Sequence, residues 1–188
     1  MVKAKVNPKY RGLSRQELQD KAYELGFNFE KNSTSCSQCT VAAIQEILDM
    51  DDVVVRVASS SCGGQTSQLL GTCGALVGGT MVLDYYFGRP LEKMSYKEFV
   101  QTNLDAILSA GEVAGLLFNK YIKEYGTIIC SHIMMQLFGR LYYVKDKGEL
   151  EKFEAVGGHS APDKCSHIVG SAARWVMEIL LDKGAVEL

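Results

Sequence analysis

Proline, long apolar runs and an excess of charge of one sign are all scarce in this chain. Its 188 residues include three prolines, and 20 lysines and arginines nearly balance 22 aspartates and glutamates. The longest weakly polar stretch, residues 71–82, is too short to cross a bilayer. The polar N-terminus lacks the apolar core of a secretory signal. We therefore expect a cytoplasmic protein that neither inserts into a membrane nor binds nucleic acid through a basic surface.

Several common catalytic and binding motifs are also missing. The sequence has no HExxH, GxSxG or EF-hand loop, and no Lys-Ser or Lys-Thr completes a P-loop after the glycines near Cys62 and Cys73. It has no CxxCH motif either, because Thr40 follows the one CxxC at Cys36. We therefore expect no covalently attached haem.

Apolar residues recur at helical spacing along most of the chain, and the three prolines fall where helices should begin or end. Residues 14–17 read Ser-Arg-Gln-Glu, a capping box that should start the first helix. Helices are also expected over 36–48, 51–60, 72–86, 96–108, 113–125, 127–138 and 162–182, with a loop at 61–67 and a break at Gly111. The run Val53-Val54-Val55 favours strand by propensity, but its shortness and helical surroundings favour helix.

These segments together predict an all-α fold, a bundle of seven or eight short helices. Residues 1–13 are expected to be an N-terminal extension, and 14–188 a single helical domain that carries the cysteines. A chain of this length can bury a core without disulfide bonds. In a reducing compartment the six cysteines are therefore more plausibly packing residues, ligands or redox thiols than a disulfide framework.

Four cysteines, Cys36, Cys73, Cys130 and Cys165, each follow a potential helix-capping residue by one to three positions. All four are therefore expected in the first turn of a helix. Free backbone N–H groups and the positive end of the helix dipole should lower the thiol pKa there and stabilise the thiolate. Four such helix starts meeting at one place would hold an iron–sulfur cluster or another thiolate-bound metal. A lone buried cysteine is usually a packing residue, but four at equivalent positions favour function.

The other two cysteines are less informative. Cys39 completes a CxxC with Cys36, and this motif fits a redox pair, half of a metal site or chance. Cys62 lies beside two glycines, where a mobile loop could bring a thiol to a site or leave it on the surface. His132 and His167 each follow a cysteine by two positions and are expected to be partly exposed helix residues, and His159 a plain loop residue.

The stretch Thr72–Gly79 resembles the signature of the redox-active family called C-GCAxxG-C-C. In that family one cysteine precedes the signature and two follow it. Cys36 matches the leading cysteine, Cys73 the signature cysteine, Cys130 the third after Tyr-Gly-Thr at 125–127, and Cys165 the fourth. The resemblance spans about residues 16–182 and leaves Cys39 and Cys62 outside the signature.

The resemblance implies a small helical protein linked to redox chemistry, often associated with oxidoreductases or transporters. Some members of this family also resemble split-Soret cytochromes, which carry haem and an iron–sulfur centre, so the chain is distantly similar to these cytochromes. Because this chain has no CxxCH, only the iron–sulfur part of that similarity carries over. The expected partner is an oxidoreductase or another electron-transfer protein, and a homodimer is compatible with the sequence.

Three hypotheses follow. In the first, the protein transfers electrons or senses redox state through a 2Fe–2S or similar cluster. The expected ligands are Cys36, Cys73, Cys130 and Cys165, and Cys62 or Cys39 could substitute for one of them. Gly74 and Gly78 are the glycines expected to contact the cofactor. In the second, a metal-free thiol–disulfide protein uses Cys73 as nucleophile and Cys36, Cys39 or Cys62 to resolve it, so that Cys73 and Cys62 are catalytic candidates. In the third, the chain is a zinc-stabilised or purely helical interaction module.

Overall fold

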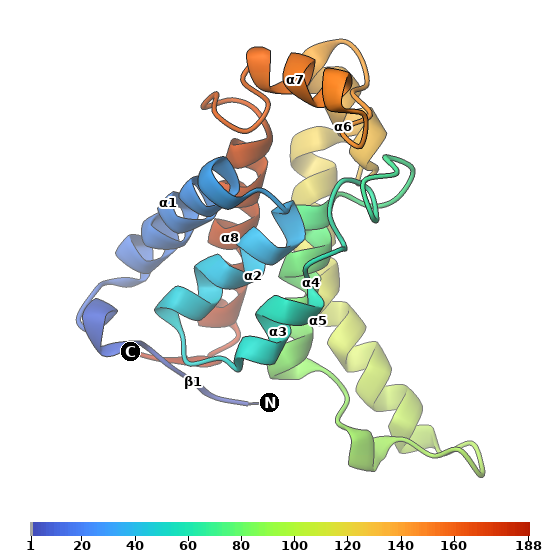
Figure 1. Ribbon diagram of the computed structural model, residues 1–188. Coiled ribbons are helices and arrows are strands. Elements are labelled where there is room, and N and C mark those ends of the chain that lie inside the picture. Colours follow the sequence, from blue (N-terminus) through green and yellow to red (C-terminus); the bar gives the residue numbers. More distant parts are fainter. Residues whose placement is uncertain (1) are drawn as a thin grey trace.

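The computed structural model describes residues 2–188 and confirms the all-α class (Figure 1). Beyond the eight α-helices of this part of the chain, two short 3₁₀ helices and two two-residue strands form. The α-helices are α1 (Arg15–Ser33), α2 (Cys36–Ile47), α3 (Asp52–Val57), α4 (Gly74–Phe87), α5 (Gln101–Tyr125), α6 (Cys130–Phe138), α7 (Lys147–Ala155) and α8 (Cys165–Asp182). The 3₁₀ helices are η1 (Pro8–Tyr10) and η2 (Leu91–Lys93), and the strands are β1 (Ala4–Lys5) and β2 (Val186–Glu187).

Helix α8 lies at the centre of the bundle and packs against α1, α2, α4 and α5 (Figure 1). Most residues of α8 are buried, because its own apolar side chains lie on more than one face of the helix and each of these faces packs against a neighbouring helix. A glycine makes its closest contact possible: a Cβ at Gly26 of α1 would lie 2.9 Å from the backbone oxygen of Val169 on α8. Helices α2 and α4 complete the main core, so the three helices that begin at Cys36, Cys73 and Cys165 pack against one another.

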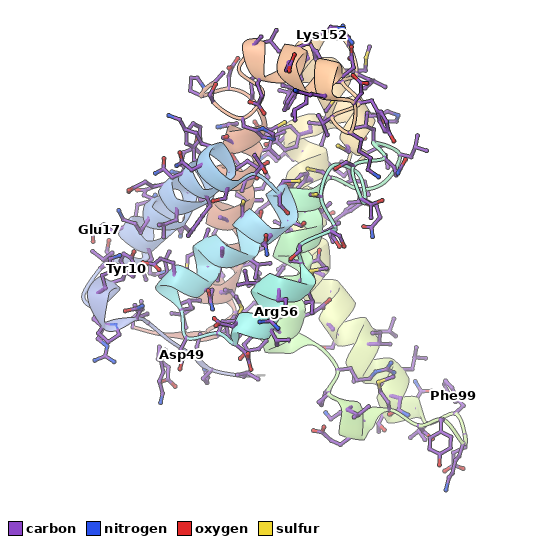
Figure 2. The ribbon with its side chains drawn as sticks, in the orientation of Figure 1. Tyr10, Glu17, Asp49, Arg56, Phe99 and Lys152 are labelled. Carbon is purple, nitrogen blue, oxygen red and sulfur yellow. The ribbon has the colours of Figure 1, made fainter. Side chains whose placement is uncertain are left out.

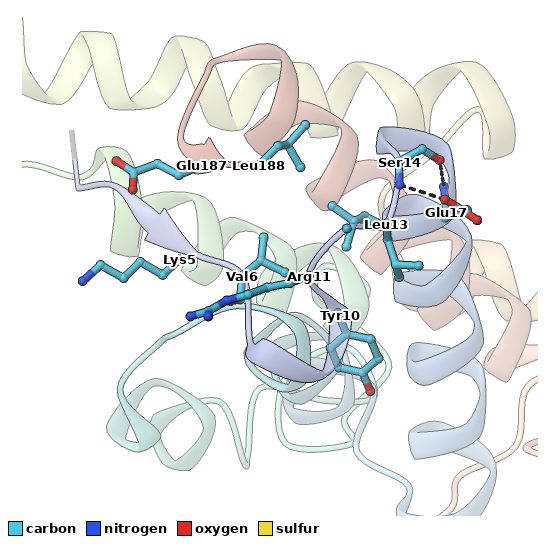
Figure 3. A pocket seen from close by; sticks show the side chains of 11 residues that line it. Lys5, Val6, Tyr10, Arg11, Leu13, Ser14, Glu17, Glu187 and Leu188 are labelled. Atoms are coloured by element: carbon cyan, nitrogen blue, oxygen red, sulfur yellow. Dashed lines mark hydrogen bonds between the residues drawn. The ribbon is translucent and has the colours of Figure 1, made fainter.

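The N-terminal segment is part of the packed structure. Strand β1 pairs in parallel with β2, and both Ala4 and Tyr10 are buried. Helix α1 then begins with the expected capping box: the Ser14 N–H donates to Glu17 Oε2 at 2.8 Å, and the Glu17 N–H donates to Ser14 Oγ at 3.3 Å (Figure 3). An open pocket of about 600 Å³ lies beside this capping box and contains no cysteine (Figure 3).

The expected break at Gly111 does not occur, and the two predicted helices 96–108 and 113–125 are one helix, α5. A glycine inside a helix costs about 1 kcal/mol relative to alanine, too little to break a long helix whose residues near the glycine, Ala110 and Val113, are buried. The buried residues Ala110, Val113 and Leu117 continue across the glycine. Residues 96–100 are outside the helix. The valine-rich segment 51–60 forms the helix α3, as predicted.

Helices α6 and α7 and the loops beside them form a smaller lobe at one end of the bundle (Figure 1). Its interior is a separate cluster of four buried residues: Leu69, Met134, Tyr142 and Phe153. Helix α7 has no counterpart among the predicted helices; Asp146 caps it by accepting from the Glu149 N–H. Over residues 2–188, no helix has both the length and the apolar character that a membrane span requires.

Candidate functional site

Five of the six cysteines line one cavity of about 360 Å³, although they are spread over 130 residues of sequence. They are Cys36, Cys62, Cys73, Cys130 and Cys165. The cavity lies between the two hydrophobic clusters: Cys36 and Cys73 pack with the main core, and Cys130 and Cys165 pack with the small one. The structure therefore brings together the four cysteines of the sequence prediction and adds Cys62 to them.

The four predicted cysteines do lie at helix starts. Cys36, Cys130 and Cys165 are the first residues of α2, α6 and α8, and Cys73 is the N-cap of α4. The expected side-chain caps are wrong, however, because none of these four helices has one. Helices α1, α3 and α7 do have side-chain caps. The cysteine helices thus leave first-turn N–H donors free for other acceptors.

Some of these donors interact with sulfur. The backbone N–H groups of Ala75 and Leu76, in the first turn of α4, act to lower the pKa of the Cys73 thiol. The N–H of Gly63, in the loop before α4, acts in the same direction on the Cys36 thiol. Backbone donors aimed at sulfur are the kind of contact that tunes thiolate-bound centres.

Backbone hydrogen bonds hold the start of α4 beside the start of α6. The Cys73 N–H donates to Ile128 O at 2.8 Å, and the Cys130 N–H donates to Gly71 O at 3.0 Å. An antiparallel bridge between Thr72 and Ile129 lies between these two bonds. This pairing brings two cysteines that are 57 positions apart to the same wall of the cavity.

The loop that carries Cys62 has a strained backbone. Residues 63–67 all have positive φ, including +47° at the β-branched Thr66. The Ser67 N–H donates to Cys62 O at 3.0 Å, and the Leu69 N–H donates to Gly63 O at 2.9 Å, so the loop is held by its own bonds. Left-handed residues of this kind persist only where the surroundings fix them, and they concentrate at functional sites.

Glycines allow the cysteines to approach one another. A Cβ at Gly74 would overlap Cys36 Sγ and lie 2.8 Å from Cys62 Cα, and a Cβ at Gly64 would lie 2.8 Å from Cys130 Cβ. Gly78 instead meets the backbone of Ser37, where α4 crosses α2. Gly74 is thus in contact with cavity cysteines, and Gly78 is a helix-packing position. That either glycine contacts a cofactor remains a prediction.

Burial changes the acidity of the thiols in the opposite direction from the sequence prediction. It raises the pKa of Cys130 to about 12 and the pKa of Cys36 and Cys165 well above the ordinary value. It also raises the pKa of Cys73, although the N–H groups of α4 act to lower it. The free-energy cost of placing a thiolate in an apolar cavity therefore exceeds the stabilisation that the helix start provides. A nearby cation, such as a bound metal ion, is needed to make the thiolate the favoured form.

A buried carboxyl group, absent from the sequence prediction, also lines the cavity. Glu30 is 2% exposed, and its Oε2 has no hydrogen-bond partner among the described residues. Its Oε1 lies 3.7 Å from His159 Nε2, and His159 Nδ1 lies 2.5 Å from Glu154 Oε1. Burial raises the pKa of Glu30 to about 7, while His159 acts to lower it. The sequence held a signal, because Glu30 continues the buried i+4 series Leu18, Ala22, Gly26 of α1.

The remaining sulfur and two histidines lie away from the cavity lining. Cys39 is buried, and its Sγ donates to Thr34 O at 2.8 Å. His132 Nδ1 lies 3.3 Å from Thr127 Oγ1, and His167 Nδ1 lies 2.8 Å from the hydroxyl of Tyr23. Only His159, expected to be a plain loop residue, reaches the cavity.

The hydroxyl groups of Tyr121 and Tyr125 are also buried without a hydrogen-bond partner in the part of the chain that the structure describes. The Tyr121 hydroxyl is fully buried near Cys73 and acts to lower the pKa of that thiol, yet it meets no partner at hydrogen-bond geometry. Within residues 2–188 no three cysteine, histidine or carboxylate side chains are already arranged around one ion position.

Comparison with models of known protein families gives a match. The model of a family described as "Putative redox-active protein (C_GCAxxG_C_C)" matches residues 34–179, which include all six cysteines. No curated protein and no solved structure matches the chain. The family match covers most of the chain and spans the cysteine-lined cavity, and the chain therefore belongs to the C_GCAxxG_C_C family of redox-active proteins.

Proposed function

We propose that the cavity binds an iron–sulfur cluster through Cys36, Cys73, Cys130 and Cys165, and that the protein transfers electrons or senses redox state. The observation that carries this proposal is the meeting of four thiols, from the starts of four helices, around one cavity of about 360 Å³. Cysteine thiolates are the usual ligands of iron–sulfur clusters. When bound, the cluster would supply one-electron chemistry.

The unpartnered polar atoms support a bound group. Buried polar atoms almost always have hydrogen-bond partners, yet Glu30 Oε2 at the cavity and the Tyr121 hydroxyl near Cys73 have none within residues 2–188. A hydroxyl and backbone N–H groups beside the sulfurs would donate to thiolates and shift their reduction potential. The apolar walls, which include Ile133, Phe153 and Ile168, would keep water from the centre.

A test begins with the full chain, purified without air. We expect visible absorbance and stoichiometric iron and sulfide, and substitution of any of the four proposed ligands by serine should lower the iron content about tenfold or more. Cys39→Ser is the matched control, because Cys39 lies outside the cavity lining and should leave the iron content unchanged. Protein that stays colourless and iron-free after anaerobic reconstitution contradicts the proposal.

A second candidate is a metal-free thiol–disulfide function. The contact of Gly74 with Cys36 Sγ and with the backbone of Cys62 favours it, because both cysteines lie at the start of the helix that Cys73 caps. In such a step Cys73 would form a disulfide with Cys62 or Cys36 while a partner disulfide is reduced to two thiols. Burial acts against it by raising the pKa of the Cys73 thiol.

Mass spectrometry separates the two candidates. Incubation of the metal-free protein with an oxidised dithiol should remove two hydrogens for each disulfide formed, and reductant should restore them. Loss of this change in both Cys73→Ser and Cys62→Ser, with retention in Cys39→Ser, supports the disulfide function. Equal alkylation of every thiol before and after the oxidant excludes it.

A further inference from the structure

Helix α5 leaves one of its faces uncovered. Its buried face, Ala110, Val113, Leu117 and Tyr121, packs toward α4 and α8. The N-terminal part of the helix and the segment before it project away from the bundle, with Phe99 near the tip (Figures 1 and 2). Large apolar side chains on this projection are exposed, as Phe99 is to 77%. Exposed apolar surface that is gathered in this way marks an interaction site.

The uncovered face carries a regular seam. Its members follow one another at intervals of 4, 3, 4, 3 and 4 residues, which is the a/d spacing of two helices that pack side by side. All the large ones are at least 36% exposed, and a Cβ at either of the two glycines would touch nothing within 4 Å. The seam consists of Leu104, Leu108, Gly111, Gly115, Phe118 and Ile122.

The seam is symmetric about Val113. Counting outward from this position in both directions pairs Gly111 with Gly115, then Leu108 with Phe118, and Leu104 with Ile122. In a two-fold contact between identical subunits, residue i meets j and j meets i, so an antiparallel pair of identical helices needs this order. We propose that α5 packs antiparallel against α5 of a second copy of the chain, with the two-fold axis at Val113. The small residues at the crossing point let the two backbones approach closely, as small-xxx-small pairs do.

The charges on α5 fit the antiparallel direction. Its N-terminal half carries Asp105 and Glu112 and no basic residue, whereas its C-terminal half carries Lys120 and Lys123 and one acidic residue, Glu124, so the two halves have net charges of −2 and +1. Lys120 is paired with Glu178, but Lys123 has no ion-pair partner among residues 2–188. An antiparallel pair places Asp105 of one copy near the level of Lys123 in the other, and a parallel pair would place like charges together.

The charge balance of the projection also favours a second copy over an anionic lipid surface. Segment 88–112 has three basic and four acidic residues, so it lacks the basic excess that such a surface attracts. The seam spans about 27 Å of helix at 1.5 Å per residue. A stable interface buries about 800 Å² per partner, and the exposed apolar residues before α5 add to the seam; they are Leu91, Met94, Tyr96 and Phe99.

The register has a consequence for the cavity. If the pairing continues beyond the seam, the apolar segment before α5 passes the C-terminal end of the partner's α5. In each copy the chain runs from that end, Tyr125, directly to the cavity cysteine Cys130. The projection of one copy would therefore lie near the cavity of the other.

Sedimentation equilibrium of the full chain, with reductant and without air, tests the pairing. We expect a dimer whose dissociation constant rises about tenfold or more in Leu108→Glu, because a charge is then buried in the seam. Val57→Glu is the matched control: Val57 on α3 is 60% exposed, comparable with 56% for Leu108, and should leave the constant unchanged. Circular dichroism checks that both variants fold. A monomer throughout the micromolar range, or a dimer that both variants weaken equally, overturns the proposal.

Charge substitutions test the direction and the axis. Asp105→Lys should weaken the dimer, and adding Lys123→Asp in the same chain should restore it, since the pair is then reversed in both copies. Glu112 lies beside the proposed axis, where it meets its own copy, so Glu112→Gln should tighten the dimer. Failure of the double variant to recover, together with no gain from Glu112→Gln, excludes the antiparallel register.

Discussion

Glu30 is a carboxyl group that the fold buries at an energetic cost. It occupies the cavity-facing position of an otherwise apolar i+4 series on α1, where one of its oxygens has no partner in the described part of the chain. An ionised carboxylate in such surroundings is disfavoured, and burial raises its pKa from 4.5 to about 7. The titratable groups that face it are His159 after α7, Glu154 on α7, Cys39 on α2 and the cavity thiols, chiefly Cys36 and Cys165. Glu30 therefore changes its charge near neutral pH in the metal-free protein.

The first prediction concerns the stability of the reduced, metal-free protein. Below pH 4.5 Glu30 is protonated in the folded and unfolded states alike, but between 4.5 and 7 the unfolded chain releases this proton first. The free energy of unfolding should therefore fall by about 3 kcal/mol across this range because of Glu30 alone. Glu30→Gln removes this loss. In urea unfolding, the free energy of unfolding of the variant should therefore rise relative to that of the parent protein from pH 4.5 to 8. A constant difference between the two proteins over that range contradicts the raised pKa.

Residue patterns predicted part of the site well. Potential caps before Cys36, Cys73, Cys130 and Cys165 placed these residues at helix starts, which the structure confirms, although none of the caps forms a side-chain bond. The predicted direction of the thiol pKa shifts was wrong. The sequence pattern locates the helix starts and hence the helix dipoles, but it does not show how deeply the four helix ends are buried together. His159 escaped prediction because its place depends on the fold of the loop after α7.

At the scale of elements, the close contact of α4 with α2 sets the geometry of the site. Gly78 lies one turn after Gly74 and meets the backbone of Ser37, so α4 is held against the helix that begins at Cys36. The glycines of α4 thus allow close approach both to a neighbouring helix and to a cysteine sulfur. In helix α5, by contrast, Gly111 suggested a break, but the buried residues Ala110 and Val113 on either side of it anchor one continuous helix.

The second prediction is that Gly78→Ala destabilises the protein by about 3 kcal/mol, because the added methyl group collides with backbone atoms that cannot move independently. Gly148→Ala is its control. The new Cβ there meets only the Asp146 side chain, at 3.3 Å, and the free energy of unfolding should change by less than about 1 kcal/mol. Urea unfolding measures both. Equal effects of the two substitutions contradict the close contact of α4 with α2.

For the whole molecule, the cavity separates two hydrophobic clusters of unequal size. The main cluster draws on α1, α2, α4, α5 and α8, whereas the small one has four buried residues between α6, α7 and the loops. A large apolar core folds without help from a metal, but a cluster of four residues contributes little by itself. The sequence predicted the helices of both parts except α7, but not this division, because heptad-like spacing shows which residues are buried and not which of them pack together.

The third prediction follows from this division. A group bound to Cys36 and Cys73 on one side and to Cys130 and Cys165 on the other would join the small lobe to the main core. Hydrogen exchange of the metal-free protein should show α2, α4 and α8 protected, and loading with iron and sulfide should slow exchange in residues 130–155 about tenfold or more. Cys130→Ser should abolish this gain while leaving the main core protected. Global unfolding on chelation would instead show that the metal holds the entire fold, as in zinc-dependent modules, and would contradict a core that is stable by its own packing.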